Sequence, residues 1–184
     1  WLAAASLPGP QVLADLLTRN DGRDYETLCP HDEDEGRWTA RGGTLCPLIS
    51  GAALCDKADR LAEGHEITLG RTASPMLLLP YLDAAARIAG REVTISWNGL
   101  CVTCGPDAPR LAHADTAGLE ADIADTVTIR PQSSTDGTAL PRATRGEMPT
   151  QTAERLTAFA QRTYAPETEE SRLSGAGAGL TDND

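Results

Sequence analysis

Residues 92–104, which read EVTISWNGLCVTC, are the part of the sequence most informative about the fold. Val93, Ile95 and Trp97 lie two positions apart and share one face of a strand, because successive side chains point to opposite faces. Asn98 and Gly99 are a favoured pair for a two-residue turn, since both tolerate a positive φ. The apolar residues that follow predict a returning strand, and the stretch as a whole predicts a β-hairpin.

Four segments around this hairpin have the periodicity of helices. Apolar residues recur three and four positions apart, and proline or a hydroxyl residue stands near each expected start. One of these segments is apolar nearly all round, ends at Gly90, and is expected to be buried on most sides. Pro80 lies within it and is expected either to kink the helix or to mark its first turn. The expected helices span 10–20, 50–64, 74–89 and 150–164.

Short strands are expected at 45–49, 67–69 and 126–129, with 111–114 beside them, and residues 23–43 are expected to be irregular. The acidic run at 31–35 is interpreted as a solvated loop. These elements predict an α+β fold, with a small, mainly antiparallel sheet and a centrally packed helix at 74–89. The predicted organisation is an α+β core at 1–131, a loop or linker at 132–149, and a C-terminal helix with a Gly-rich tail at 150–184 that packs on the same domain.

Charge and cysteine content narrow the class of protein. The 184 residues carry a formal net charge of −11, which disfavours nucleic-acid binding because that binding needs clustered cations. The sequence has no apolar run of the length that crosses a membrane, so no membrane association is expected. Five cysteines, an odd number without the density of a disulfide scaffold, favour a reducing compartment and a cytoplasmic location.

Residues that often carry chemistry are present but scattered. Cys101 and Cys104 form one Cys-x-x-Cys pair, and on a strand their side chains point to opposite faces, which opposes shared metal ligation. The histidines His31, His65 and His113 each stand alone, without a local catalytic signature. We therefore expect no metal and no cofactor, assign no catalytic residue, and leave enzymatic activity open.

The C-terminal end of the chain is the candidate functional site. Alternating glycines let backbone N–H groups approach a ligand or partner closely, an arginine can pair with an anion, and an aspartate can bind a metal or a cationic group. A flexible tail is the alternative interpretation of the same residues. The candidate residues for ligand or partner binding are Ser171, Arg172, Gly175, Gly177, Gly179 and Asp182.

The same ending resembles that of a bacterial family known only as domain of unknown function three-seven-two-six. The similarity extends to the opening Trp1-Leu2-Ala3-Ala4, to Leu45-Cys46-Pro47-Leu48, and to 74–86 with its Leu-Leu-Leu-Pro-Tyr core. In that family further residues precede the Trp-Leu pair, so the resemblance implies that part of the N-terminus is missing here. It brings no activity, cofactor or catalytic residue, but a family-wide ending implies that the tail is more than a loose end.

Two classes of function remain. In the first, the protein is an interaction or accessory subunit of a cytoplasmic metabolic system, and its Gly-rich tail inserts into a groove on a protein partner or on a second copy. In the second, it is an enzyme or binding protein for an anionic metabolite, which Arg172 and the glycine N–H groups hold while Asp182 acts as acid, base or metal ligand.

Overall fold

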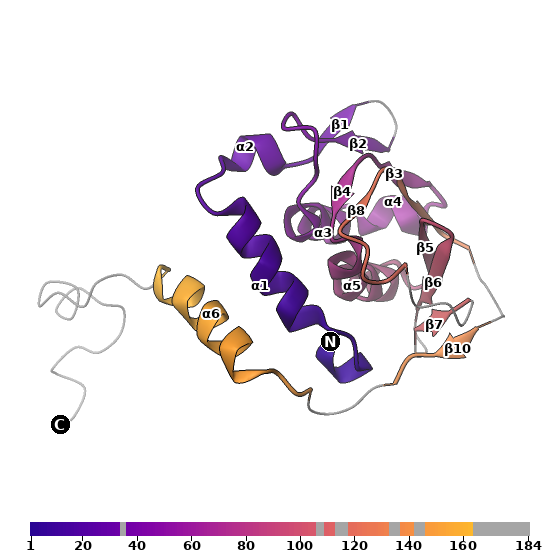
Figure 1. The fold of residues 1–184 in the computed structure, drawn as a ribbon. Helices are drawn as coiled ribbons and strands as arrows, with labels where there is room; N and C mark the ends of the chain where they lie inside the picture. Colours follow the sequence, from indigo (N-terminus) through magenta and orange to yellow (C-terminus); the bar gives the residue numbers. More distant parts are fainter. Residues whose placement is uncertain (34–35, 106–108, 113–117, 133–136, 142–145, 164–184) are drawn as a thin grey trace, which may run out of the picture.

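The computed structural model describes residues 1–33, 36–105, 109–112, 118–132, 137–141 and 146–163. Helices and strands alternate around a mixed sheet (Figure 1). Among the paired strands of these ranges, β2 and β3 run parallel and every other pair is antiparallel. The predicted α+β class and the mainly antiparallel sheet are therefore confirmed.

The sheet is larger than expected. Eight strands follow one another in the order β1-β2-β3-β9-β5-β6-β7-β10, and β4 and β8 form a separate pair. The strands are β1 (His31–Glu33), β2 (Arg37–Thr39), β3 (Ile67–Leu69), β4 (Thr72–Ala73), β5 (Val93–Trp97), β6 (Leu100–Cys104), β7 (Arg110–Leu111), β8 (Ile123–Ala124), β9 (Val127–Arg130) and β10 (Thr138–Ala139).

The predicted hairpin is confirmed at the middle of this sheet. β5 and β6 pair from Val93 opposite Cys104 to Trp97 opposite Leu100. Asn98 and Gly99 both take a positive φ in the turn, as the two-residue connection requires. β9 pairs with the other edge of β5, and β7 with the other edge of β6, so the hairpin is covered on both sides.

Helices form the rest of the fold. Figure 1 shows α1 and α6 side by side, with α3 and α5 between α1 and the sheet, and the contacts of α5 with α3, α4, β5 and β6 agree with this layering. The helices are α1 (Gly9–Asn20), α2 (Tyr25–Leu28), α3 (Pro47–Asp56), α4 (Ala58–Ala62), α5 (Leu79–Ala89) and α6 (Thr150–Gln161), with short 3-10 helices η1 (Ala3–Ala5) and η2 (Pro75–Leu78).

The segment expected as one helix at 74–89 consists of η2 followed by α5. Pro80 lies in the first turn of α5, where backbone N–H groups have no acceptor within the helix. Proline therefore costs no hydrogen bond there, and Pro80 marks the start of the helix instead of a kink. Gly90 ends the helix with a φ of 66°, as predicted. The inner face is fully buried, for example at Leu82, but Ile88 is 67% exposed, so the expectation of burial on most sides is wrong for the last turn.

Three segments differ from expectation, and each contains a residue that pairs with a distant strand, although α2 and the β1–β2 hairpin are local. The stretch at 23–43 contains α2, β1 and β2, and the backbone of His31–Glu33 forms a strand instead of a loop. At 45–49, Leu45 makes a single bridge to Thr72, and Pro47 then begins α3. Within 132–149, β10 pairs with β7 at the edge of the main sheet.

Candidate functional site

All six candidate residues of the tail lie outside the residues that the structure describes. These are Ser171, Arg172, Gly175, Gly177, Gly179 and Asp182. The structure does describe α6, the helix that precedes them. The site is therefore built from the way in which α6 is held, and from the surface hollows near it.

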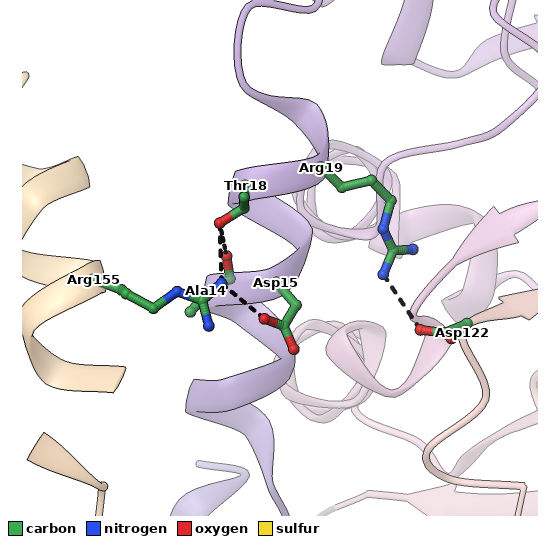
Figure 2. A network of polar contacts seen from close by, with 6 residues as sticks. All are labelled: Ala14, Asp15, Thr18, Arg19, Asp122 and Arg155. Carbon is green, nitrogen blue, oxygen red and sulfur yellow. Dashed lines mark hydrogen bonds and ion pairs between the residues drawn. The ribbon is translucent and has the colours of Figure 1, made fainter. Parts of the chain in front are cut away.

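Polar contacts attach α6 to α1 (Figure 2). The guanidinium of Arg155 donates to the carboxylate of Asp15 at 2.8 Å and to the hydroxyl of Thr18 at 3.0 Å. The Thr18 hydroxyl in turn donates to the backbone carbonyl of Ala14 at 2.8 Å, which orients its oxygen. Arg155 of α6 thus donates to two acceptors on one turn of α1.

A second contact lies one to two turns further along both helices. Arg162 donates to Asp21 at 2.7 Å, and its guanidinium stacks 4.7 Å from the ring centre of Phe159. The two contacts follow the same direction along both helices, so α1 and α6 run parallel. Each ion pair is substantially exposed, and such pairs contribute about 0–1 kcal/mol.

An apolar hollow of about 360 Å³ lies beneath α6. Its walls come from η1, α1, α3, η2, α5 and α6, and they carry no charged side chain. Leu156 and Phe159 of α6 are half-buried, whereas Ala160 is exposed. α6 therefore covers part of this hollow without filling it, and Thr152 is its one fully buried residue.

A buried carboxylate stands next to this hollow. Asp83 on α5 accepts a hydrogen bond from the Trp1 indole N–H at 2.9 Å. It also forms an ion pair with Arg87 at 3.2 Å. These contacts fix the Trp1 ring at the rim of the hollow. Sequence reasoning missed Asp83: its i,i+4 spacing to Arg87 was a usable signal, whereas its burial and its contact with Trp1, 82 residues away, depend on the fold.

A smaller hollow of about 110 Å³ lies at the C-terminal end of α1. Arg19, Asn20, Arg23 and Thr44 supply its polar lining. Arg19 also crosses to Asp122, 3.3 Å away, so part of its charge is already compensated (Figure 2). The helix dipole places partial negative charge at this end of α1, which weakens the site for an anion.

The cysteines remain separate thiols. None of the five forms a disulfide, and Cys101 and Cys104 lie three residues apart on β6, on opposite faces as the sequence indicates. Burial raises the pKa of the Cys101 thiol. Burial, and secondarily the charge of Asp56, raises the pKa of the Cys55 thiol, which donates to the Tyr81 carbonyl at 3.4 Å. Both thiols therefore stay protonated and weakly nucleophilic near neutral pH.

Tyr81 lines the hollow beneath α6, and its backbone carbonyl accepts from the Cys55 thiol. Burial raises the pKa of its phenol, and the neighbouring Cys46 and Cys55 raise it further. A phenol with a raised pKa stays protonated and acts as a hydrogen-bond donor and an apolar surface, not as a base. The side chain is placed by Gly51 on α3, where a Cβ atom would overlap the Tyr81 ring.

Metal-ligating side chains do not gather in the described ranges. No group of three His, Cys, Asp or Glu there is placed to hold a metal ion. His31 begins β1, His65 lies 3.7 Å from Glu63 at the surface, and His113 is outside the described residues. Among the helices that the structure describes, none has the length and apolar character needed to cross a bilayer.

The fold and the hollows define an α+β protein with a surface-mounted C-terminal helix. A family model described as "Protein of unknown function (DUF3726)" matches residues 1–46, which confirms the predicted resemblance to that family. The match includes the Trp1-Leu2 opening and Leu45-Cys46, over about a quarter of the chain. The searches of curated proteins and of solved structures gave no match.

Proposed function

We propose that this protein is an interaction or accessory subunit of a cytoplasmic metabolic system, and that it engages its partner through the segment that follows α6. The observation that carries the proposal is the mode of attachment of α6. This helix rests on α1 through exposed ion pairs and buries little of its own surface. In this proposal, α6 is a surface element from which the chain engages its partner.

The cysteines and the glycine pattern support the same proposal. The absence of a disulfide among the five cysteines suits a reducing compartment. Glycines alternating with alanines at 175–179 let a peptide backbone enter a narrow groove, where its N–H and C=O groups pair with the partner. In this account the partner is a protein or a second copy of the chain.

Deletion of residues 171–184 tests the proposal. We expect the deleted protein to keep the melting temperature of the full chain, because the deletion starts well beyond α6. We also expect it to lose its assembly, measured by light scattering, and its co-purifying partner. A deleted protein that assembles and co-purifies as the full chain does would remove the proposal.

Paired variants sharpen the role of the glycines. Replacing Gly175, Gly177 and Gly179 by Ala adds a Cβ at each position and is expected to weaken assembly as the deletion does. Replacing Ala176 and Ala178 by Gly removes Cβ atoms from the same segment and is expected to leave assembly intact. If both sets weaken assembly equally, the glycines are not what the partner recognises.

The second candidate function is the binding of an anionic metabolite. The hollow at the end of α1 favours it, since Arg23 and Arg19 line a space large enough for a phosphate or carboxylate group. The ion pair of Arg19 with Asp122 and the negative end of the helix dipole oppose it, and we rank it below the interaction.

A melting-temperature series with inorganic phosphate and with citrate tests this second candidate. Binding at the hollow predicts a rise that Arg23→Ala abolishes, whereas binding by the tail predicts a rise that Arg172→Ala abolishes. Arg60→Ala, far from both places in the sequence, is the matched control. Absence of any rise with either anion removes the candidate.

A further inference from the structure

A third hollow, of about 480 Å³, lies between α2 and α3 on the surface of the protein. Leu48, Ile49 and Ala52 on α3 form its floor, and Tyr25 on α2 forms one wall. Tyr25 is 59% exposed, Leu48 and Ile49 are half-buried, and Ala52 is exposed. The surface is therefore apolar, concave and open to solvent, as grooves that receive an amphipathic segment are.

Acidic groups border this apolar floor. Asp56, at the end of α3, belongs to the lining. The Glu26 carboxylate lies 4.0 Å from the Cys29 sulfur, and Cys29 also lines the hollow. Two carboxylates, Asp56 and Glu26, thus lie at or next to the lining, and no arginine or lysine is among the described residues that line the hollow.

The nearest lysine in the sequence is directed to another part of the fold. Lys57 directly follows Asp56, and its ammonium group lies 5.8 Å from the ring centre of Trp38. Trp38 belongs to β2, which lies between β1 and β3 in the sheet, and it is not among the residues that line the hollow. The described lining therefore carries the negative charge of Asp56 and no positive charge.

We propose that the hollow between α2 and α3 is a docking site for a cationic amphipathic segment of a partner protein. The apolar side chains of this segment cover Leu48, Ile49 and Tyr25, and its Lys or Arg side chains pair with Asp56 and Glu26. Complementary charge steers such a segment to the site, and the apolar floor supplies the contact area. The site is separate from the C-terminal segment, so this proposal and the proposed function can fail independently.

Charge decides against the other occupants. The chain's own residues 164–184 contain Glu167, Glu169, Glu170, Asp182 and Asp184 against the one cation Arg172, so the acidic rim repels them. A second copy carries the same net charge of −11, and an anionic lipid surface or a nucleic acid is also negative. A segment of opposite charge remains.

The test measures binding of a labelled helical peptide of Leu and Lys to the full chain, by fluorescence anisotropy. A peptide in which Glu replaces every Lys is the matched probe. We expect the Leu–Lys peptide to bind and the Leu–Glu peptide not to bind. No binding of the Leu–Lys peptide, or equal binding of the two, overturns the proposal.

Variants of the chain locate the binding. Ala52→Arg places bulk and a positive charge on the exposed floor and is expected to weaken binding about tenfold or more, a loss of about 1.4 kcal/mol. Ala158→Arg makes the same substitution on the exposed face of α6 and is expected to leave binding unchanged. Equal losses in the two variants mean attraction by overall charge alone and overturn the docking site.

A second pair separates apolar contact from electrostatics without a change in charge. Tyr25→Ala removes an exposed aromatic side chain from the wall of the hollow. It is expected to weaken binding of the Leu–Lys peptide about threefold to tenfold. Ile88→Ala removes an equally exposed apolar side chain from the far turn of α5 and is expected to have no effect. A Tyr25→Ala protein that binds as the unsubstituted chain does contradicts the proposed contact.

Discussion

The last two helices of the described chain, α5 and α6, are similar in length and in hydrophobic periodicity but are held in different ways. α5 buries five residues against α3, α4 and the sheet, whereas α6 buries one and relies on exposed ion pairs with α1. Periodicity in the sequence therefore identifies a helix, but it does not indicate how much tertiary packing stabilises that helix. That depends on what the rest of the chain places opposite its apolar stripe.

The largest expected effect comes from a matched pair of leucine truncations, one in each helix. Leu82→Ala in α5 removes a fully buried side chain and is expected to lower the free energy of unfolding by about 3 kcal/mol. Leu156→Ala in α6 removes a half-buried side chain and is expected to cost less than about 1 kcal/mol. Urea unfolding followed by tryptophan fluorescence measures both, and similar losses would erase the contrast between the helices.

The next effect tests the close packing of α3 against α5. Gly51→Ala adds a Cβ that meets the Tyr81 ring, and overpacking of this kind costs about 1–3 kcal/mol. In a Tyr81→Ala background the ring is gone, and the better helix propensity of Ala then makes the same change neutral or stabilising. Thermal unfolding of the unsubstituted chain, the two single variants and the double variant gives the coupling free energy between positions 51 and 81. The same cost in both backgrounds would mean that Tyr81 is not the obstacle.

A smaller effect is expected at the polar attachment of α6. Arg155→Ala removes the ion pair with Asp15 and the hydrogen bond to Thr18, and is expected to cost less than about 1 kcal/mol. A double-mutant cycle with Asp15→Ala isolates the pair, and its coupling should shrink in 1 M salt, where the Debye length is about 3 Å. A coupling that is large and independent of salt would show that α6 is anchored more firmly than its exposed contacts indicate.

The smallest effect concerns the Cys55 thiol. Since burial and Asp56 raise its pKa, its thiolate fraction at a given pH is lower than that of a free cysteine, and its alkylation by iodoacetamide is slower and still rising at alkaline pH. Asp56→Asn removes the negative charge and is expected to speed alkylation a few-fold. Mass spectrometry of the modified peptide measures the rate. Faster alkylation than that of a free cysteine would contradict the direction of the shift.

The raised pKa of the Cys55 thiol also makes the free energy of unfolding depend on pH in a defined direction. The folded state holds the Cys55 proton more tightly than the unfolded state does. Its contribution to stability is therefore complete below the pKa of the unfolded thiol and declines as the pH rises through the folded pKa.

Local chemistry in the sequence predicted the parts of the fold that depend on neighbouring residues. The Asn98-Gly99 turn, the Pro10 start of α1 and the Gly90 stop of α5 each require a specific backbone conformation that few residues adopt. The parts that failed depend on distant partners. Trp38 is buried because β2 pairs with β3, thirty residues away, and nothing in the polar sequence around it indicates that partner.

The hollows were unpredictable for the same reason. Tyr25 and Asp56 lie on separate elements, α2 and α3, and both line the third hollow. The sequence did not indicate α2, so it could not indicate this hollow. The tail residues were identified from their composition and remain the basis of a proposal. Sequence patterns thus locate segments of unusual chemistry, whereas a concave surface exists only once separate elements have packed together.

Native-state hydrogen exchange of α5 and α6 tests the central claim that the C-terminal helix is a surface arm on a self-sufficient core. Exposed contacts with little burial predict that α6 opens alone, with backbone protection at least about tenfold lower than that of α5 and insensitive to Leu82→Ala. Equal protection of the two helices, lost together on heating or in the Leu82→Ala protein, would show one cooperative unit and contradict the account.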